Sequence, residues 1–170
     1  RVATEKVDEK FQGSLTLEAI IDTELINGLY NPEVLYAIER VSSNINNITT
    51  GNMGIGKVVS FVDIIKETNQ ALNENRQEYY SIPDSADLIA QEFLLFESSG
   101  NNDLESLVDA NYSKARITLR TPFTDSLEGN QFLGRAQSYF DQEFEGLAKV
   151  TFTGIGTLMT VTFEQAIYSS

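Results

Sequence analysis

The sequence of 170 residues contains no cysteine and no histidine. Without cysteine the chain has no disulfides, no thiolate metal ligands and no cysteine nucleophile. Without histidine it lacks the commonest general base and the commonest ligand of transition metals. These two absences argue against most enzyme chemistry. We therefore expect a protein that is not an enzyme and that has no catalytic, cofactor-binding or metal-binding residues.

Positive charge is scarce as well. Only 12 Lys and Arg residues stand against 25 Asp and Glu residues, which leaves a net charge of −13. A nucleic-acid backbone or an anionic lipid surface is bound by clustered cations. We therefore predict no nucleic-acid partner.

Long apolar runs are missing too. The longest uncharged stretch near the end, Val150–Phe163, has 14 residues, of which five are Thr, whereas a bilayer-spanning helix needs about 20 mostly apolar residues. The chain starts at Arg1 without a basic-then-apolar signal segment. We interpret it as a processed protein or as a segment of a longer one.

The sequence does contain enough apolar material for one core. Hydrophobic residues make up 41% of the chain and aromatic residues 10%, and a chain of this mass buries roughly 70% of its extended surface on folding. Apolar and polar residues alternate along Leu15–Asp22 and Tyr112–Thr121, which predicts two half-buried strands. The tripeptide at 31–33 (Asn-Pro-Glu) has the cap, the proline and the acid of a helix start.

The predicted order of elements is strand, helix, strand, helical segment, strand, helix, strand, helix. Without the helical segment this is the β-α-β-β-α-β order of the ferredoxin-like split βαβ fold. We therefore predict a single α+β domain with an antiparallel sheet, a helical insertion and a C-terminal helix. Its expected parts are a first half at 14–61, the insertion at about 62–108, a second half at 109–154 and the last helix at 155–170, with strands at 15–22, 57–62, 112–121 and 148–153.

The usual strand order of this fold places the first strand between the third and the fourth. Acidic residues of the first strand then share the face away from the helices with basic residues of its neighbours. We expect ion pairs there, each contributing about 0.2–1 kcal/mol. The acids are Glu18 and Asp22, and the bases are Lys114, Arg116, Arg120 and Lys149.

Short motifs do not define an active site. The segment Gly51–Val58 matches the phosphate-loop pattern G-x-x-x-x-G-K, but it lacks the Ser or Thr that binds magnesium and precedes a strand instead of a helix. Two acidic clusters lack the spacing of a calcium loop, and we interpret them as solvated surface. The clusters are Asp103, Glu105 and Asp109, and Asp141, Glu143 and Glu145.

Aromatic residues gather in the helical insertion, where Tyr79, Tyr80, Phe93 and Phe96 are the candidates for a functional surface. In one interpretation these side chains only attach the extra helices to the sheet. In the other they form a surface or cleft for an apolar ligand or a neighbouring domain.

Four stretches together resemble a known family. They are Gly56–Leu72, Tyr79–Asp84 followed by Ile89–Glu97, Asp109–Arg120 and Thr153–Leu158. In their order and spacing they are similar to an extracytoplasmic loop of predicted exporters of the resistance–nodulation–division (RND) superfamily, in the branch that includes the mycobacterial-type lipid exporters. The resemblance covers roughly residues 14–160.

The resemblance implies a periplasmic or extracytoplasmic part of a bacterial or archaeal inner-membrane protein. Porter modules of that family are ferredoxin-like, and its members export hydrophobic or amphiphilic molecules with the proton gradient. The helix expected at 155–170 would then lead toward a membrane span. The implied partners are the rest of the transporter with a second porter-like domain, a hydrophobic or amphiphilic small molecule or lipid, and further copies in a homo-oligomer. No catalytic residue of the family transfers to this chain.

We therefore expect a porter-domain fragment of a proton-driven RND-type exporter. The alternative is a free-standing ferredoxin-like ligand-binding or interaction domain without catalysis. A third hypothesis is a metal-dependent enzyme that uses carboxylates alone.

Overall fold

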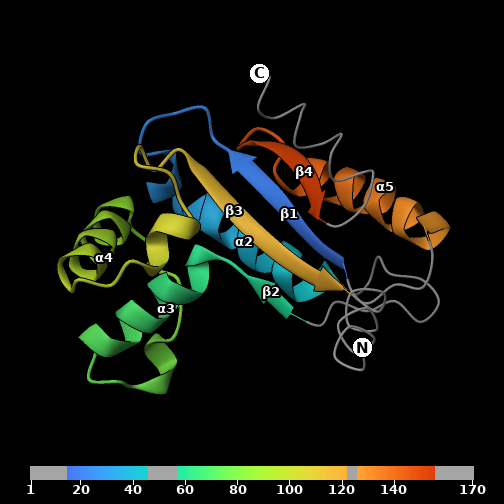
Figure 1. Ribbon diagram of the computed structural model, residues 1–170. Helices are drawn as coiled ribbons and strands as arrows, with labels where there is room; N and C mark the ends of the chain where they lie inside the picture. Colours follow the sequence, from blue (N-terminus) through green and yellow to red (C-terminus); the bar gives the residue numbers. More distant parts are fainter. Residues whose placement is uncertain (1–14, 46–56, 122–125, 156–170) are drawn as a thin grey trace.

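The computed structural model describes residues 15–45, 57–121 and 126–155 as a four-stranded antiparallel sheet with helices (Figure 1). The strands lie in the order β2-β3-β1-β4. This order places the first strand between the third and the fourth, so the predicted α+β, ferredoxin-like arrangement is confirmed. The strands are β1 (Leu15–Asp22), β2 (Lys57–Val59), β3 (Lys114–Thr121) and β4 (Lys149–Ile155).

Two groups of helices accompany the sheet. One group, α2 and α5, covers one face of the sheet, while α3 and α4 lie to one side of it, beyond β2 and β3 (Figure 1). The helices are α2 (Pro32–Asn44), α3 (Phe61–Leu72), α4 (Ala86–Ser98) and α5 (Ser126–Glu143), with short 3₁₀ turns η1 (Gly28–Tyr30), η3 (Gln77–Tyr79) and η4 (Asp103–Ser106).

The alternating pattern of β1 buries one side of that strand completely. Leu17, Ala19 and Ile21 are fully buried and face the helices. Each lies opposite a buried residue of β3, because the antiparallel register pairs them with Leu119, Ile117 and Ala115. The core therefore lies between β1, β3 and β4 on one side and α2 and α5 on the other.

Side-chain caps decide where the helices begin. The Asn31 side chain accepts a hydrogen bond from the N–H of Glu33 at 3.0 Å, which is the predicted start of α2. The buried Ser60 accepts from the N–H of Val62 at 3.2 Å and starts α3 at Phe61. The prediction of a strand over 57–62 is therefore wrong at its end, because this serine starts a helix there.

The start of β3 and the end of β4 differ from the bounds predicted from the sequence. β3 begins at Lys114, two residues later than expected, because Tyr112 has a positive φ of 51° that a strand does not permit. β4 continues to Ile155, where the sequence suggested the start of the last helix. The rest of that predicted helix, residues 156–170, lies outside the described residues, as does the part of the glycine motif at 51–56, whereas Lys57 and Val58 of that motif belong to β2.

The insertion is attached to the sheet domain through aromatic rings. Phe93 of α4 stacks on Phe61 of α3 with ring centroids 5.5 Å apart, and it contacts the ring of Tyr112 at 4.6 Å. Since Phe61 and Phe93 are buried in the same cluster as the sheet residues, the insertion and the sheet share one core.

The open face of the sheet carries the expected mixture of charges. The carboxylate of Glu18 lies 3.6 Å from the guanidinium of Arg116 on the neighbouring strand, which confirms one predicted ion pair. Asp22 lies opposite Lys114 and Lys149 in the register. Its carboxylate accepts a hydrogen bond from the N–H of Glu24 at 2.9 Å and forms no ion pair among the described residues, so the ion pair predicted for Asp22 is not formed.

The ring pair of Phe140 and Phe152 gives a test of the packing of α5 on β4. The two buried rings meet edge to face with centroids 5.0 Å apart. Replacing Phe152 by Ala is expected to lower the free energy of unfolding by about 3–5 kcal/mol, because a cavity replaces the ring. Urea denaturation measures the loss.

The control for this variant is Leu25→Ala, because Leu25 is 67% exposed. It should change the free energy of unfolding by no more than about 0.5 kcal/mol. Equal losses in the two variants would show that β4 does not form part of a packed core.

Candidate functional site

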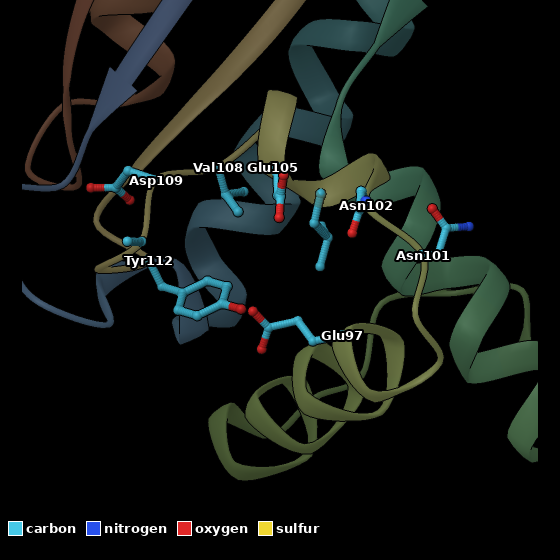
Figure 2. Close-up of a pocket in the computed structure, with 9 residues that line it drawn as sticks. Glu97, Asn101, Asn102, Glu105, Val108, Asp109 and Tyr112 are labelled. Atoms are coloured by element: carbon cyan, nitrogen blue, oxygen red, sulfur yellow. The ribbon is translucent and has the colours of Figure 1, made fainter.

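A cavity of about 610 Å³ lies where the insertion rejoins the sheet domain. Its walls come from the end of α4, the turn η4 and the loop that precedes β3 (Figure 2). A volume of a few hundred Å³ is typical of small-molecule sites. The lining residues are Glu97, Asn101, Asn102, Leu104, Glu105, Val108, Asp109, Ala110 and Tyr112.

Tyr112 is the aromatic residue of this pocket and is held in a fixed position. Its ring packs on Phe93 at 4.6 Å and on Tyr30 at 5.6 Å. Figure 2 shows its hydroxyl pointing toward the carboxylate of Glu97. Burial and a hydrogen bond to Glu97 both raise the pKa of Tyr112, so the phenol stays protonated at neutral pH. The ring and hydroxyl together form a rigid wall.

Asp109 organises the loop at the other end of the pocket. Its carboxylate accepts hydrogen bonds from the backbone N–H of Ser113 at 2.8 Å and of Lys114 at 2.9 Å, and from the Ser113 hydroxyl at 2.6 Å. Burial alone would raise the pKa of Asp109, but these hydrogen bonds outweigh it and lower the pKa. Because its oxygens already have these partners, Asp109 serves mainly to hold the backbone.

The charge of the pocket has one sign. The lining contains three acidic residues, two amides and no basic residue. Among the described residues no group of three or more His, Cys, Asp or Glu side chains has the arrangement of a metal site. The polar chemistry available is therefore that of separate carboxylates and amides beside one aromatic ring.

A smaller hollow of about 270 Å³ lies at the edge of the open sheet face. It is bordered by Ile20 of β1, by Lys114 and Arg116 of β3 and by residues 105–109. Its walls combine both signs of charge, so it lacks the uniform acidic character of the larger pocket.

The four aromatic residues singled out from the sequence do not line either of these two hollows. Phe93 belongs to the buried core, and Phe96 is half-buried against it. Tyr79 and Tyr80 are half-buried elsewhere in the insertion, beneath Arg76 and Lys66 at 4.7 Å each. Their role as an apolar binding surface remains a prediction.

Sequence reasoning did not identify the pocket. The sequence predicts only a solvated acidic cluster at Glu105 and Asp109 and the start of a strand at Tyr112, and Glu97 belongs to a stretch that carries the family resemblance. The pocket depends on the positive φ of Tyr112, a backbone conformation that turns its ring toward α4. Nothing in the alternating pattern that continues into β3 marks that backbone turn.

No protein-family model and no curated protein matches this chain. Within 15–45, 57–121 and 126–155, no helix is both long enough and apolar enough to cross a membrane.

The hydrogen bonds of Asp109 predict an effect of substitution at neutral pH. Asp109→Asn should lower the free energy of unfolding by about 1–3 kcal/mol, because charged acceptors make the stronger hydrogen bonds. Since the folded pKa of Asp109 is lowered, its contribution is present above its ordinary pKa of 3.8 and is lost as the pH falls through the folded pKa. Urea denaturation at neutral and acid pH measures both effects.

The control is Asp103→Asn, an exposed acid of the same sequence cluster. We expect it to leave both stability and its acid dependence nearly unchanged. A loss for Asp103→Asn as large as that for Asp109→Asn would mean that general charge, and not the loop contacts, governs stability here.

Proposed function

We propose that the chain is a non-catalytic porter-type module of an RND-like exporter, on the extracytoplasmic side of a bacterial or archaeal inner membrane. The observation that carries this proposal is the strand order β2-β3-β1-β4 with a helical insertion between β2 and β3. Porter modules are ferredoxin-like in the family that the sequence resembles. Topology and sequence resemblance therefore support the same class of protein.

The larger pocket gives such a module a place to contact a transported molecule. Leu104, Val108, Ala110 and the ring of Tyr112 offer apolar surface, while carboxylates and amides lie beside them. A lining of this kind suits an amphiphilic molecule with an apolar body and a polar head. The module would shape the path of hydrophobic or amphiphilic molecules, and proton transfer would take place elsewhere in the transporter.

The open sheet face is available for the partners that this function requires. It exposes Lys114, Arg116 and Lys149 among polar residues. A second porter-like domain, or another copy in a homo-oligomer, could cover such a polar face through ion pairs.

Export is tested with the complete protein in its own cells. Deleting the gene should raise the accumulation of a lipophilic dye such as Nile red, and the wild-type gene should reverse the change. Glu105→Lys places a positive charge in the pocket wall and should restore export less well. Dye fluorescence per cell measures the result.

Glu74→Lys is the matched control, because the Glu74 side chain is 84% exposed and is not among the residues of the pocket. It should restore export as the wild type does. Dye accumulation that does not respond to gene deletion would contradict the export function. Full restoration by Glu105→Lys would exclude the pocket from the path.

The charge of the pocket favours a second candidate, a free-standing binding domain for a small organic cation. Acidic side chains beside a tyrosine ring suit a quaternary ammonium group. In this case choline should shift the amide NMR signals of Tyr112 and of the segment 101–105, whereas its neutral analogue 3,3-dimethylbutanol should not.

The Glu97→Gln variant should weaken choline binding about threefold or more, since it removes a carboxylate from the pocket. Binding should also weaken as salt is added, because ions screen exposed charges. Glu74→Gln is the control and should bind as the wild type. Equal shifts with choline and with the neutral analogue would rule out recognition of the charge.

A further inference from the structure

Glu92 of α4 is a buried acid that has no hydrogen-bond partner in the part of the chain that the structure describes. Its side chain is fully buried, and neither carboxylate oxygen has a hydrogen-bond partner among the described residues. A carboxylate in such a place loses its hydration without compensation, so its ionised form is strongly disfavoured. The buried acids and bases of folded proteins are usually paired, which makes this residue exceptional.

Within 15–45, 57–121 and 126–155, no charged group compensates the carboxylate of Glu92. α4 packs against α3 and η1, and its neighbouring residues Ile89 and Phe93 are part of the core. Burial is the sole cause of the shift in its pKa, which rises from 4.5 to about 7. The titratable groups on α3, η1 and α4, and the one beside Phe93, therefore do not contribute to the raised pKa of Glu92. They are Asp63, Lys66 and Glu67 of α3, Tyr30 of η1, Asp87 and Glu97 of α4 itself, and Tyr112.

Two of these charged groups, Lys66 and Glu97, interact with residues other than Glu92. The Lys66 ammonium lies 2.7 Å from the carboxylate of Glu39. Glu97 lies on the pocket side of α4, where it contributes to raising the pKa of Tyr30 and of Tyr112. Neither a counter-ion nor a hydrogen-bond donor of the described residues reaches Glu92, so a proton is what neutralises it.

We propose that Glu92 is a proton-binding site that controls the packing of α4: the protonated acid lets α4 pack on α3 and η1, and ionisation loosens it. The helix carries Glu97 into the wall of the larger pocket, and its Phe93 supports the ring of Tyr112. Loosening α4 therefore alters that pocket. The proposal does not depend on the function proposed above.

The direction of the pH effect follows from the raised pKa. Between the ordinary value of 4.5 and about 7, the folded helix holds a proton that the opened form has released. The free energy of opening therefore falls as the pH rises through this range and levels off above about pH 7. Below pH 4.5 both forms are protonated and the effect disappears.

Hydrogen exchange of the backbone amides tests the proposal. At about pH 8 the protection factors of α4, corrected for intrinsic exchange, should be at least tenfold lower than at about pH 5. Those of α2 are the internal reference and should change less. In Glu92→Gln, a neutral side chain of nearly the same shape, the pH dependence of α4 should disappear.

Glu67→Gln is the control, because Glu67 is an exposed acid on the helix against which α4 packs. It should keep the wild-type pH dependence. Equal protection of α4 at the two pH values in the wild type would overturn the proposal, and so would an unchanged pH dependence in Glu92→Gln.

A second measurement keeps the proposal testable if Glu92→Gln does not fold. The carboxyl carbon of Glu92 can be followed by NMR in the wild-type protein during a pH titration. A midpoint well above 4.5 is expected. A midpoint at the ordinary value would overturn the proposal without any variant, and neither experiment involves export or choline binding.

Discussion

The contacts of Phe93 hold the insertion to the rest of the molecule. Its ring packs on Phe61 at the start of α3 and on Tyr30 and Tyr112 of the sheet domain, with centroids 4.6–5.7 Å apart. Large aromatic groups contribute strongly to packing because each removes much apolar surface from water. Both the position of Glu97 in the wall of the larger pocket and the burial of Glu92 depend on this docking, since both residues belong to α4.

Charge is distributed unevenly over this acidic chain. The open face of the sheet exposes Lys114, Arg116, Arg120 and Lys149, whereas the lining of the larger pocket has no basic residue. The sheet face therefore carries both signs of charge, since Glu18 and Asp22 lie on it as well, whereas the pocket beside α4 is acidic. The net charge of −13 alone does not reveal this separation.

Much of the fold could be predicted because its signals are local. The alternation at Leu15–Asp22 and the Asn31 cap both lie within a few residues of the structure that they specify, and both elements formed as expected. The errors lie where one side chain or one backbone angle overrides a pattern. Ser60 ends the pattern of β2 by starting a helix, and the positive φ of Tyr112 delays the start of β3.

Periodicity and capping act over short distances, so the order of strands and helices along the chain, the buried side of each central strand and the mixed charge of the open sheet face follow from local sequence patterns. The meeting of Glu97 and Tyr112 at one pocket, and the burial of Glu92 without a hydrogen-bond partner among the described residues, depend instead on how distant segments pack. Helical spacing alone does not tell how α4 is oriented against α3 and η1. That orientation comes from aromatic contacts between segments far apart in the chain, such as Tyr30, Phe93 and Tyr112.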